Sequence, residues 1–258
     1  MRVHATALLP LALAAILVSP ANSAVLLTDS FSYPDGNLVG NGGWANYSGA
    51  LTDIQVMLGR AVGSGPNAND DHTLFAAQPT SSPTYACFDV IIPAIVGAPK
   101  PIYFAELKDG SAALLVARVY VLAITGGWTF GISYSSTSAT VGVTPWSATT
   151  LSYNTNYRLA IKYDPAVFTA KLWVNPVNEA STSVSNVGTS AAIAVSGFGL
   201  RQSASASTLP ASPSYAGTVD WGFSVDNLGV GTTFDDACSG GVTPTQKSTW
   251  GGLKTIYR

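Results

Sequence analysis

The sequence predicts an all-β protein, built as one antiparallel two-sheet β-sandwich domain, on three observations. Past residue 24 no stretch keeps the apolar period of about 3.6 residues that marks an amphipathic helix. Short runs of alternating apolar and polar residues recur instead, as in 157–163, where Tyr157, Leu159 and Ile161 share one face. Clusters of glycine, proline, asparagine and aspartate separate these runs, which is typical of strands joined by turns.

The same alternation predicts further strands along the chain. Besides 157–163 they cover residues 25–33, 53–62, 85–92, 102–108, 114–124, 128–135, 171–175, 193–200 and 218–230. The dipeptides Asp109-Gly110 and Gly126-Gly127 each fall between two of these strands, and such dipeptides favour tight hairpin turns because glycine readily adopts a positive φ. Residues 63–72, 135–149 and 201–215 are interpreted as surface loops.

Residues 1–24 are predicted to be a secretory signal peptide. Arg2 gives a positive start, the apolar run 5–18 follows, and small residues near position 24 offer cleavage points, although Asn22 leaves the scissile bond open. The apolar run is shorter than the ~20 residues that a transmembrane helix needs. We therefore expect a mature chain without a transmembrane segment, secreted or at the cell surface, with a sandwich over 25–235 and a linker and tail over 236–258.

The composition suits extracellular work. Charged residues make up only 10% of the 258 residues, and the formal net charge is −2, so the surface must be largely neutral and polar. No cluster of lysines and arginines could neutralise several phosphates, which argues against a nucleic-acid partner. Cys87 and Cys238 are the only cysteines, and in an exported chain they are predicted to form a disulfide.

Two segments resemble the opening and closing strands of laminin-G/concanavalin-A-like jelly rolls in secreted bacterial proteins: LTDSFSYPDGNL at 27–38 with Gly43-Trp44, and VDNLGVGTT at 225–233. Segments 117–119, 130–133 and 172–176 are similar to internal strands of that group. The resemblance implies two packed sheets, adjacent first and last strands, and often a structural calcium ion. The ending TWGGLKTIYR at 249–258 resembles tails of exported bacterial surface proteins, and we interpret it as a candidate sorting or docking tag.

The chain lacks the residues that hydrolytic enzymes usually need. The chain has two glutamates, and Glu106 with Asp109 does not match the Glu-x-Asp-x-x-Glu run of jelly-roll glucanases, so Glu106 is interpreted as a solvated strand residue on the same face as Phe104 and Lys108. His72, the only histidine past the signal peptide, falls in a predicted loop, and loop polarity accounts for it. We therefore predict no catalytic residues and no hydrolytic activity.

Aspartates and tryptophans are the candidate ligand residues. Asp29 and Asp226 are predicted to supply carboxylates to a structural calcium ion that joins the opening segment to the closing strand, with backbone carbonyls completing the shell. Most tryptophans are expected in the core. Trp173, predicted on the strand face opposite the core, and Trp146, in a loop, are candidate platforms for stacking on sugar rings.

These features favour a non-catalytic, secreted or surface-attached module for glycan binding or adhesion, with glycans or cell-surface components as partners. A self-assembling extracellular structural subunit is a second hypothesis, because low charge reduces repulsion between packed copies. A glycan hydrolase or lyase is the third, since the fold that the chain resembles also carries such enzymes.

Overall fold

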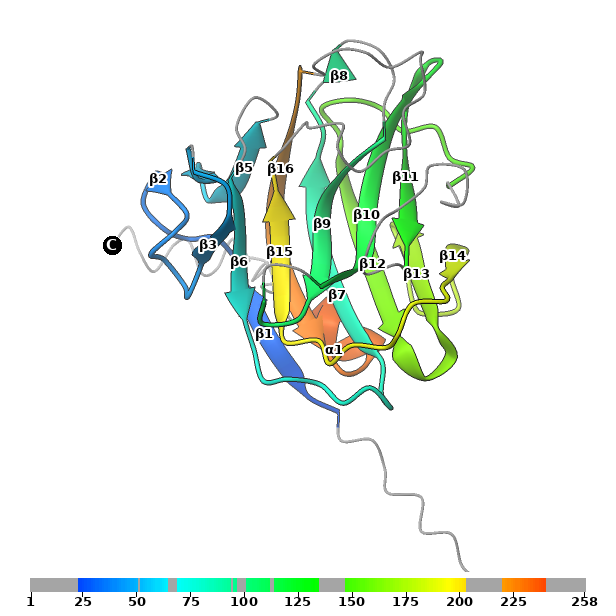
Figure 1. Cartoon of the computed structure of the whole chain (residues 1–258). Coiled ribbons are helices and arrows are strands. Elements are labelled where there is room, and N and C mark those ends of the chain that lie inside the picture. The colour runs from blue at the N-terminus through cyan, green and yellow to red at the C-terminus, as the bar shows by residue number, and fades with distance from the viewer. Residues whose placement is uncertain are drawn as a thin grey trace, which may run out of the picture.

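The computed structural model describes residues 23–50, 52–64, 69–93, 95–96, 101–111, 114–134, 147–202 and 220–239. Within these residues two antiparallel β-sheets, one of ten strands and one of six, pack face to face (Figure 1). The predicted antiparallel two-sheet β-sandwich is therefore confirmed. No helix in the described part of the chain is long and apolar enough to cross a membrane.

The ten-stranded sheet has the order β14-β13-β12-β7-β16-β5-β4-β2, and β1 and β8 also pair with β16. Its strands are β1 (Val25–Asp29), β2 (Gly36–Asn37), β4 (Gln55–Met57), β5 (Arg60–Ser64), β7 (Thr84–Ile91), β8 (Ile95–Val96), β12 (Asn156–Asp164), β13 (Thr169–Val174), β14 (Ser183–Val187) and β16 (Asp220–Gly231). A 3-10 turn (Pro165–Val167) joins β12 to β13. The first described strand, β1, pairs with the last, β16, and places Asp29 opposite Leu228.

The six-stranded sheet has the order β11-β10-β9-β15-β6-β3. Its strands are β3 (Ala45–Ser48), β6 (Asp70–Leu74), β9 (Ile102–Lys108), β10 (Leu115–Ile124), β11 (Gly127–Ser133) and β15 (Gly197–Arg201). The predicted hairpin at Gly126-Gly127 is confirmed: Ile124 pairs with Gly127, and Gly126 has a φ of 86°. Asp109-Gly110 does follow β9, which pairs antiparallel with β10, but β10 begins only at Leu115 and Gly110 is not among the glycines with positive φ, so the predicted tight turn at this dipeptide is wrong.

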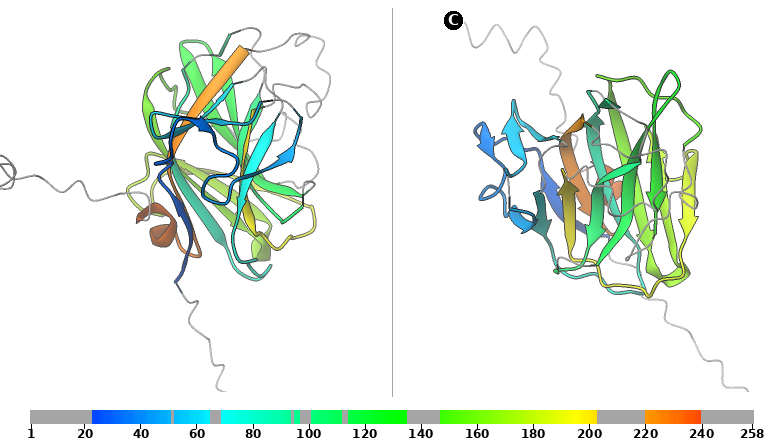
Figure 2. Two further views of the ribbon diagram at one scale, coloured as in Figure 1. Left: turned by 90° about the vertical axis from the view of Figure 1, so that its left-hand side faces the viewer. Right: turned by 45° about the horizontal axis from the view of Figure 1, so that its top comes forward.

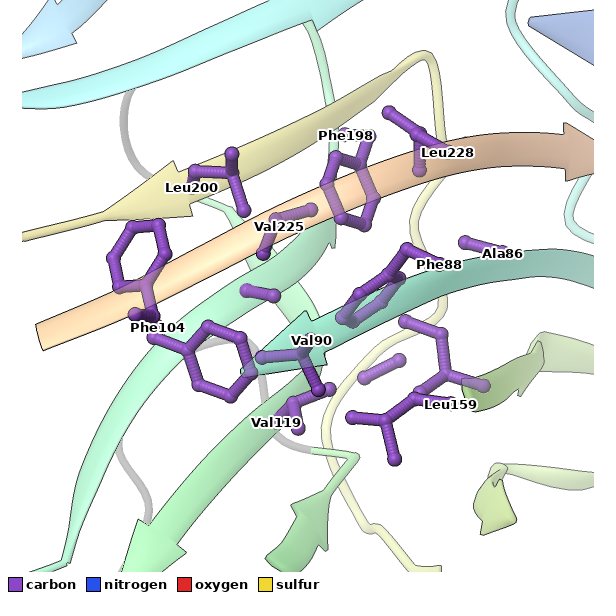
Figure 3. Close-up of a cluster of buried hydrophobic side chains, with 14 of the residues drawn as sticks. Ala86, Phe88, Val90, Phe104, Val119, Leu159, Phe198, Leu200, Val225 and Leu228 are labelled. Atoms are coloured by element: carbon purple, nitrogen blue, oxygen red, sulfur yellow. The ribbon is translucent and has the colours of Figure 1, made fainter. Parts of the chain in front are cut away.

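The core lies between the two sheets, where alternate residues of each strand meet. In β7 the side chains of Ala86, Phe88 and Val90 are fully buried in this core. Figure 3 shows Phe88 of one sheet beside Phe104 and Phe198 of the other, with ring centroids 6.3 and 5.5 Å from that of Phe88. Because burying a phenylalanine side chain contributes about 1.5–3 kcal/mol, these alternating positions hold the sandwich together.

One strand assignment and one loop assignment made from the sequence are wrong. The predicted strand 53–62 is broken into β4 and β5 by a turn at Leu58 and Gly59, whose φ angles are 53° and 72°. Residues 70–72, predicted as a loop, form the start of β6. Alternation of apolar residues could not detect β6, because Asp70-Asp71-His72 contains none.

A short helix, α1 (Phe234–Ser239), lies on the outer face of the ten-stranded sheet (Figure 2). Phe234 packs its ring edge-on against Tyr85 and Trp173, at centroid distances of 6.5 and 5.8 Å. Cys238, near the end of α1, forms the predicted disulfide with Cys87 of β7, and the two Cα atoms are 5.0 Å apart. The helix is therefore fixed to the sheet both by a covalent bond and by aromatic packing.

Candidate functional site

The outer face of the six-stranded sheet gathers charged and aromatic side chains that are buried or half-buried. We call this surface the polar face. Its members lie on β3, β6, β9, β10 and β15 and are Tyr47, Asp70, His72, Tyr103, Glu106, Lys108, Arg118, Tyr120 and Arg201. Since only 10% of the chain is charged, so many buried ionisable groups on one face need an explanation.

An irregularity in β9 brings two of these residues to the polar face. The register of β9 against β10 shifts between Ala105 and Tyr103, and Phe104 and Ala105 both belong to the core. The residues that follow are displaced to the opposite face, as a β-bulge requires, so Glu106 and Lys108 point outward. Strict alternation predicts Glu106 and Lys108 on the face of Phe104, and the irregularity makes that prediction wrong.

Glycines of the neighbouring strand make room for both side chains. Gly199 of β15 lies opposite Glu106, and Gly197 lies opposite Lys108. A Cβ atom at Gly199 would collide with the carboxylate of Glu106, and one at Gly197 would lie 3.2 Å from Cγ of Lys108. The lack of side chains at Gly197 and Gly199 therefore lets two long charged side chains lie across β15.

Glu106 is fully buried, with 0% of its surface exposed, so its interpretation as a solvated residue is wrong. The hydroxyl of Tyr47 donates a hydrogen bond to Oε1, while Oε2 has no hydrogen-bond partner among the described residues. Burial raises the pKa of Glu106, and the bond from Tyr47 and the positive charge of Arg201 oppose that rise. Glu106 is therefore a buried carboxylate with one oxygen that lacks a donor among the described residues.

Lys108 ties β9 to β6 at the edge of the polar face. Its Nζ atom lies 2.9 Å from Nδ1 of His72 and 2.9 Å from the carbonyl oxygen of Asp109, and it also bonds the carbonyl oxygen of Ser111. These acceptors match the three hydrogens of an ammonium group. Burial lowers the pKa of Lys108, and the nearby carboxylates of Glu106 and Asp109 oppose that shift.

His72 is neutral at pH 7 in this environment. Burial and the positive charge of Lys108 lower its pKa to about 4. Its Nδ1 atom receives the bond from Lys108, so the ring hydrogen is assigned to Nε2. The ring stacks on Tyr47 with centroids 5.0 Å apart, and Nζ of Lys108 lies 4.6 Å from the centroid of Tyr47.

Two guanidinium groups converge on one aromatic ring at the other end of the polar face. Arg201 and Arg118 lie 4.2 and 5.2 Å from the ring centroid of Tyr103. Arg201 also pairs with Asp70, with 3.6 Å between Nε and Oδ2. Burial nevertheless raises the pKa of Asp70 to about 7, because desolvation outweighs the attraction of Arg201.

Of the two tryptophans predicted as sugar platforms, one is described. Trp173 lies on the outer face of β13, opposite the core, as the alternation predicts. It is only 1% exposed because α1 covers it, and its Nε1 atom donates to the carbonyls of Glu179 and Ser181. The prediction of an exposed stacking surface at Trp173 is therefore wrong, and Trp146 lies outside the described residues.

The predicted calcium ligands Asp29 and Asp226 both have protein partners. The carboxylate of Asp29 accepts bonds from the amide of Phe31 at 2.7 Å, the hydroxyl of Tyr33 at 3.0 Å and Nε1 of Trp44 at 2.7 Å. Asp226 pairs with Arg60 at 3.2 Å. In the described part of the chain no cluster of three or more histidine, cysteine or acidic side chains is placed to bind a metal ion. The calcium site stays a prediction.

That prediction has a direct test. If calcium binds the folded chain through Asp29 and Asp226, saturating calcium should raise the melting temperature and a chelator should lower it. A concentration 100 times the dissociation constant stabilises a protein by about 2.7 kcal/mol. Differential scanning calorimetry with calcium, with magnesium and with chelator gives the measurement. Three coincident melting curves would contradict the calcium site and leave Asp29 as a hydrogen-bond acceptor for Tyr33 and Trp44.

The sequence contains a signal for the polar face that the predictions overlooked. Arg118 and Tyr120 sit two residues apart inside the apolar strand β10, and Glu106 and Lys108 do the same in β9. Polar residues at alternate positions of strands indicate a face that lies away from the core. Because strand order cannot be read from the sequence, nothing there indicates that these pairs share one face with Asp70 and Arg201.

Comparison with protein-family models finds no match, and comparison with curated proteins finds none either. Among solved structures, the chain is similar to a chain described as a sialidase, with a TM-score of 0.55 and 11% identity over 84% of this chain and 19% of that chain. It is also similar to the CBM2 module of the evolved Dit of Lactobacillus casei BL23 phage J-1, with a TM-score of 0.47 and 11% identity over 82% of this chain and 96% of that module. The chain thus spans 19% of the sialidase chain, and that likeness concerns the fold.

Proposed function

We propose that this protein is an exported glycan-binding module whose ligand occupies the polar face, where Glu106 accepts hydrogen bonds from sugar hydroxyls. The observation that carries the proposal is Oε2 of Glu106, a buried acceptor without a partner among the described residues. Leaving such a group unpaired costs about 1–3 kcal/mol, so buried acceptors are normally satisfied. A ligand rich in hydroxyl groups supplies the missing donor.

The other members of the polar face suit the same ligand class. A sugar hydroxyl both donates and accepts hydrogen bonds, so it needs acceptors and donors in one place. Asp70 and Glu106 provide acceptors, and Arg118 and Arg201 carry guanidinium donors. Aromatic rings next to these groups offer apolar surface, and the combination of apolar lining with a few polar groups is typical of small-molecule sites.

We infer that a ligand reaches Glu106 past the edge strand β3. Tyr47 of β3 is half-buried, whereas the acidic and basic members of the polar face are buried. Its hydroxyl already occupies Oε1 of Glu106. A ligand that enters past β3 and displaces this hydroxyl gains access to both carboxylate oxygens.

The disulfide between Cys87 and Cys238 supports the exported setting of this proposal. Disulfides persist in oxidising compartments and are rare in the cytosol. A structural disulfide of this kind suits a protein that works outside the cytoplasm, where polysaccharides are exposed.

A glycan array probed with the oxidised protein tests the proposal. We expect binding to a restricted set of glycans, and we expect Glu106→Gln to weaken it about 10- to 100-fold, the equivalent of roughly 1–3 kcal/mol for a lost hydrogen bond to a charged group. The matched control is Glu179→Gln, which alters the other glutamate, an exposed residue that bonds Tyr85 beside the ten-stranded sheet. This control should bind like the unmodified chain.

A second variant separates loss of binding from loss of folding. Tyr47→Phe removes the hydroxyl that competes for Oε1 of Glu106 and leaves the carboxylate in place, so it should bind at least as tightly as the unmodified chain. Melting curves establish that each variant is folded. Equal binding by Glu106→Gln and the unmodified chain would refute the proposed site. A chain that binds no glycan and elutes as large assemblies on size exclusion would favour the structural-subunit hypothesis instead.

A lyase is the second candidate, favoured by the contact of His72 with Tyr47 and Lys108. The lowered pKa of His72, about 4, leaves a neutral imidazole, and its Nδ1 can accept the proton next to a uronate carboxyl group once the substrate displaces the hydrogen bond from Lys108. Burial raises the pKa of Tyr47, so its phenol stays protonated and can donate to the departing glycosidic oxygen. The two transfers cleave the carbon–oxygen bond and leave a carbon–carbon double bond.

Ultraviolet absorbance of unsaturated products measures this activity on uronic-acid polymers. If the chain is a lyase, we expect turnover that His72→Ala abolishes and Glu179→Gln preserves. A lack of turnover in a chain that still binds the polymer would exclude the lyase and keep the binding function.

A further inference from the structure

The residue that precedes β1 is held by the segment that enters α1, and Figure 2 shows β1 running beside the helix. The backbone N–H of Ala24 donates to Oγ1 of Thr232 and to Oδ2 of Asp236, both at 3.0 Å. The carbonyl of Ala24 accepts a bond from the amide of Thr232 at 3.0 Å. The hydroxyl of Ser23 lies 2.6 Å from Oδ1 of Asp236. Ala24 is therefore fixed at both its amide and its carbonyl.

The nitrogen of Ala24 has more acceptors than a peptide amide can use. An amide carries one hydrogen, which here is shared between a hydroxyl and a carboxylate at equal distance. An α-ammonium group at the same position carries three hydrogens and a positive charge. It could give a separate hydrogen to each acceptor and form an ion pair with Asp236, and such charge-assisted bonds are roughly twice as strong as neutral ones.

The sequence around this nitrogen matches a processing site. Signal peptidases cut after a small–x–small pattern, in which the third and first residues before the bond are small. Cleavage after Ser23 places Ala21 and Ser23 at those two positions. Cleavage after Ala24 would place the larger Asn22 there and would remove the residue that bonds Thr232 and Asp236.

We propose that the chain is cut between Ser23 and Ala24 and that the new α-ammonium group of Ala24 binds Asp236 and Thr232. Water adds across the peptide bond: the hydroxyl goes to the carbonyl carbon of Ser23 to give a carboxylate, and the protons go to the nitrogen of Ala24 to give the ammonium. The hydroxyl of Ser23 leaves with the signal peptide, and the ammonium takes its place beside Asp236.

The proposed contact between Ala24 and Asp236 would be a further attachment of α1 to the sheet. Thr233 caps the helix, since its Oγ1 accepts a bond from the amide of Asp236 at 3.1 Å. In the uncut chain, hydrogen bonds from Ser23 and Thr233 lower the pKa of Asp236, and after cleavage the ammonium group of Ala24 would replace Ser23 as a donor to this carboxylate. The start of α1 would thus be bound to the mature N-terminus, while its end is bound through Cys238 to Cys87.

Mass spectrometry and N-terminal sequencing of the exported protein test the cleavage. The full chain is expressed in a bacterium that exports it, and the protein is collected outside the cytoplasm. We expect a chain that begins at Ala24. A chain that begins at Asn22 or Val25, or that retains residues 1–23, would overturn the proposal.

A thermal double-mutant cycle tests the ion pair. A chain that begins at Asn22 keeps the peptide amide of Ala24, and we expect it to melt about 2–4 °C below the chain that begins at Ala24, the shift that about 1 kcal/mol produces in a protein of this size. With Asp236→Asn in both chains that difference should vanish. With Asp235→Asn, the neighbouring acid in the same helical turn, it should persist. Equal melting temperatures of the two unmodified chains would refute the ion pair.

Discussion

Reduction of the Cys87–Cys238 disulfide is expected to destabilise the folded protein by roughly 4–5 kcal/mol and to lower its melting temperature by about 10 °C or more. The two cysteines are 151 residues apart, so the bond closes a loop over more than half of the chain. In the chain-entropy model, closing so long a loop removes much of the conformational freedom of the unfolded state. The value of roughly 4–5 kcal/mol is an upper figure for this contribution. Melting curves with and without a thiol reductant give the measurement.

The double variant Cys87→Ala with Cys238→Ala is the control for the reductant. It should melt near the reduced protein and should not respond to the reductant. Because α1 is also held by packing of Phe234 against Trp173, a second measurement distinguishes local release from global loss. Hydrogen exchange of residues 234–239 should speed up on reduction more than exchange in β7. Identical melting of the oxidised and reduced proteins would contradict the expected contribution.

Phe104→Ala is expected to cost about 3–5 kcal/mol of unfolding free energy, because it leaves a cavity where the two sheets meet. Phe104 is 0% exposed, and its ring contacts those of Phe88, Phe130 and Phe223 at centroid distances of 6.3, 6.1 and 5.5 Å. These neighbours come from both sheets, so little of the surrounding structure can collapse into the gap. Denaturant unfolding monitored by circular dichroism measures the loss.

Phe104→Leu keeps the measurement possible if the alanine variant does not fold, and it should lose less stability than Phe104→Ala. Val187→Ala is the matched control, since Val187 lies on the edge strand β14 and is 72% exposed. We expect this control to stay within about 0.5 kcal/mol of the unmodified chain, as surface substitutions usually do. Similar costs for Phe104→Ala and Val187→Ala would contradict the central place of Phe104 in the core.

The sequence predicted the strands of the core well because burial on one side leaves a period of two. In β12 the residues Leu159, Ile161 and Tyr163 alternate toward the core, and the structure buries all of them. Where a strand lacks apolar residues, as at Asp70-Asp71-His72 in β6, the same rule fails. The periodicity reports burial rather than hydrogen bonding, so a polar strand is invisible to it.

The candidate site could not be predicted in the same way, because its residues are distant in the sequence. Tyr47, Glu106 and Arg201 come from three separate parts of the chain and meet only because β3, β9 and β15 belong to one sheet. A local register shift then decides which face Glu106 occupies. The spacing of residues in a single sequence predicts neither the order of the strands in a sheet nor the position of a bulge.

The sequence by itself therefore determined the class of fold, the hairpin at Gly126-Gly127 and the pairing of Cys87 with Cys238, since each follows from local pattern or from composition. Tertiary structure alone decided the exposure of the polar and aromatic residues. Trp173 is on the outer face that the alternation predicts, yet α1 covers it. Glu106 is interpreted as a solvated residue from the sequence, yet it is buried. Burial depends on what packs against a residue from elsewhere in the chain, and those contacts exist only once the strands are ordered in space.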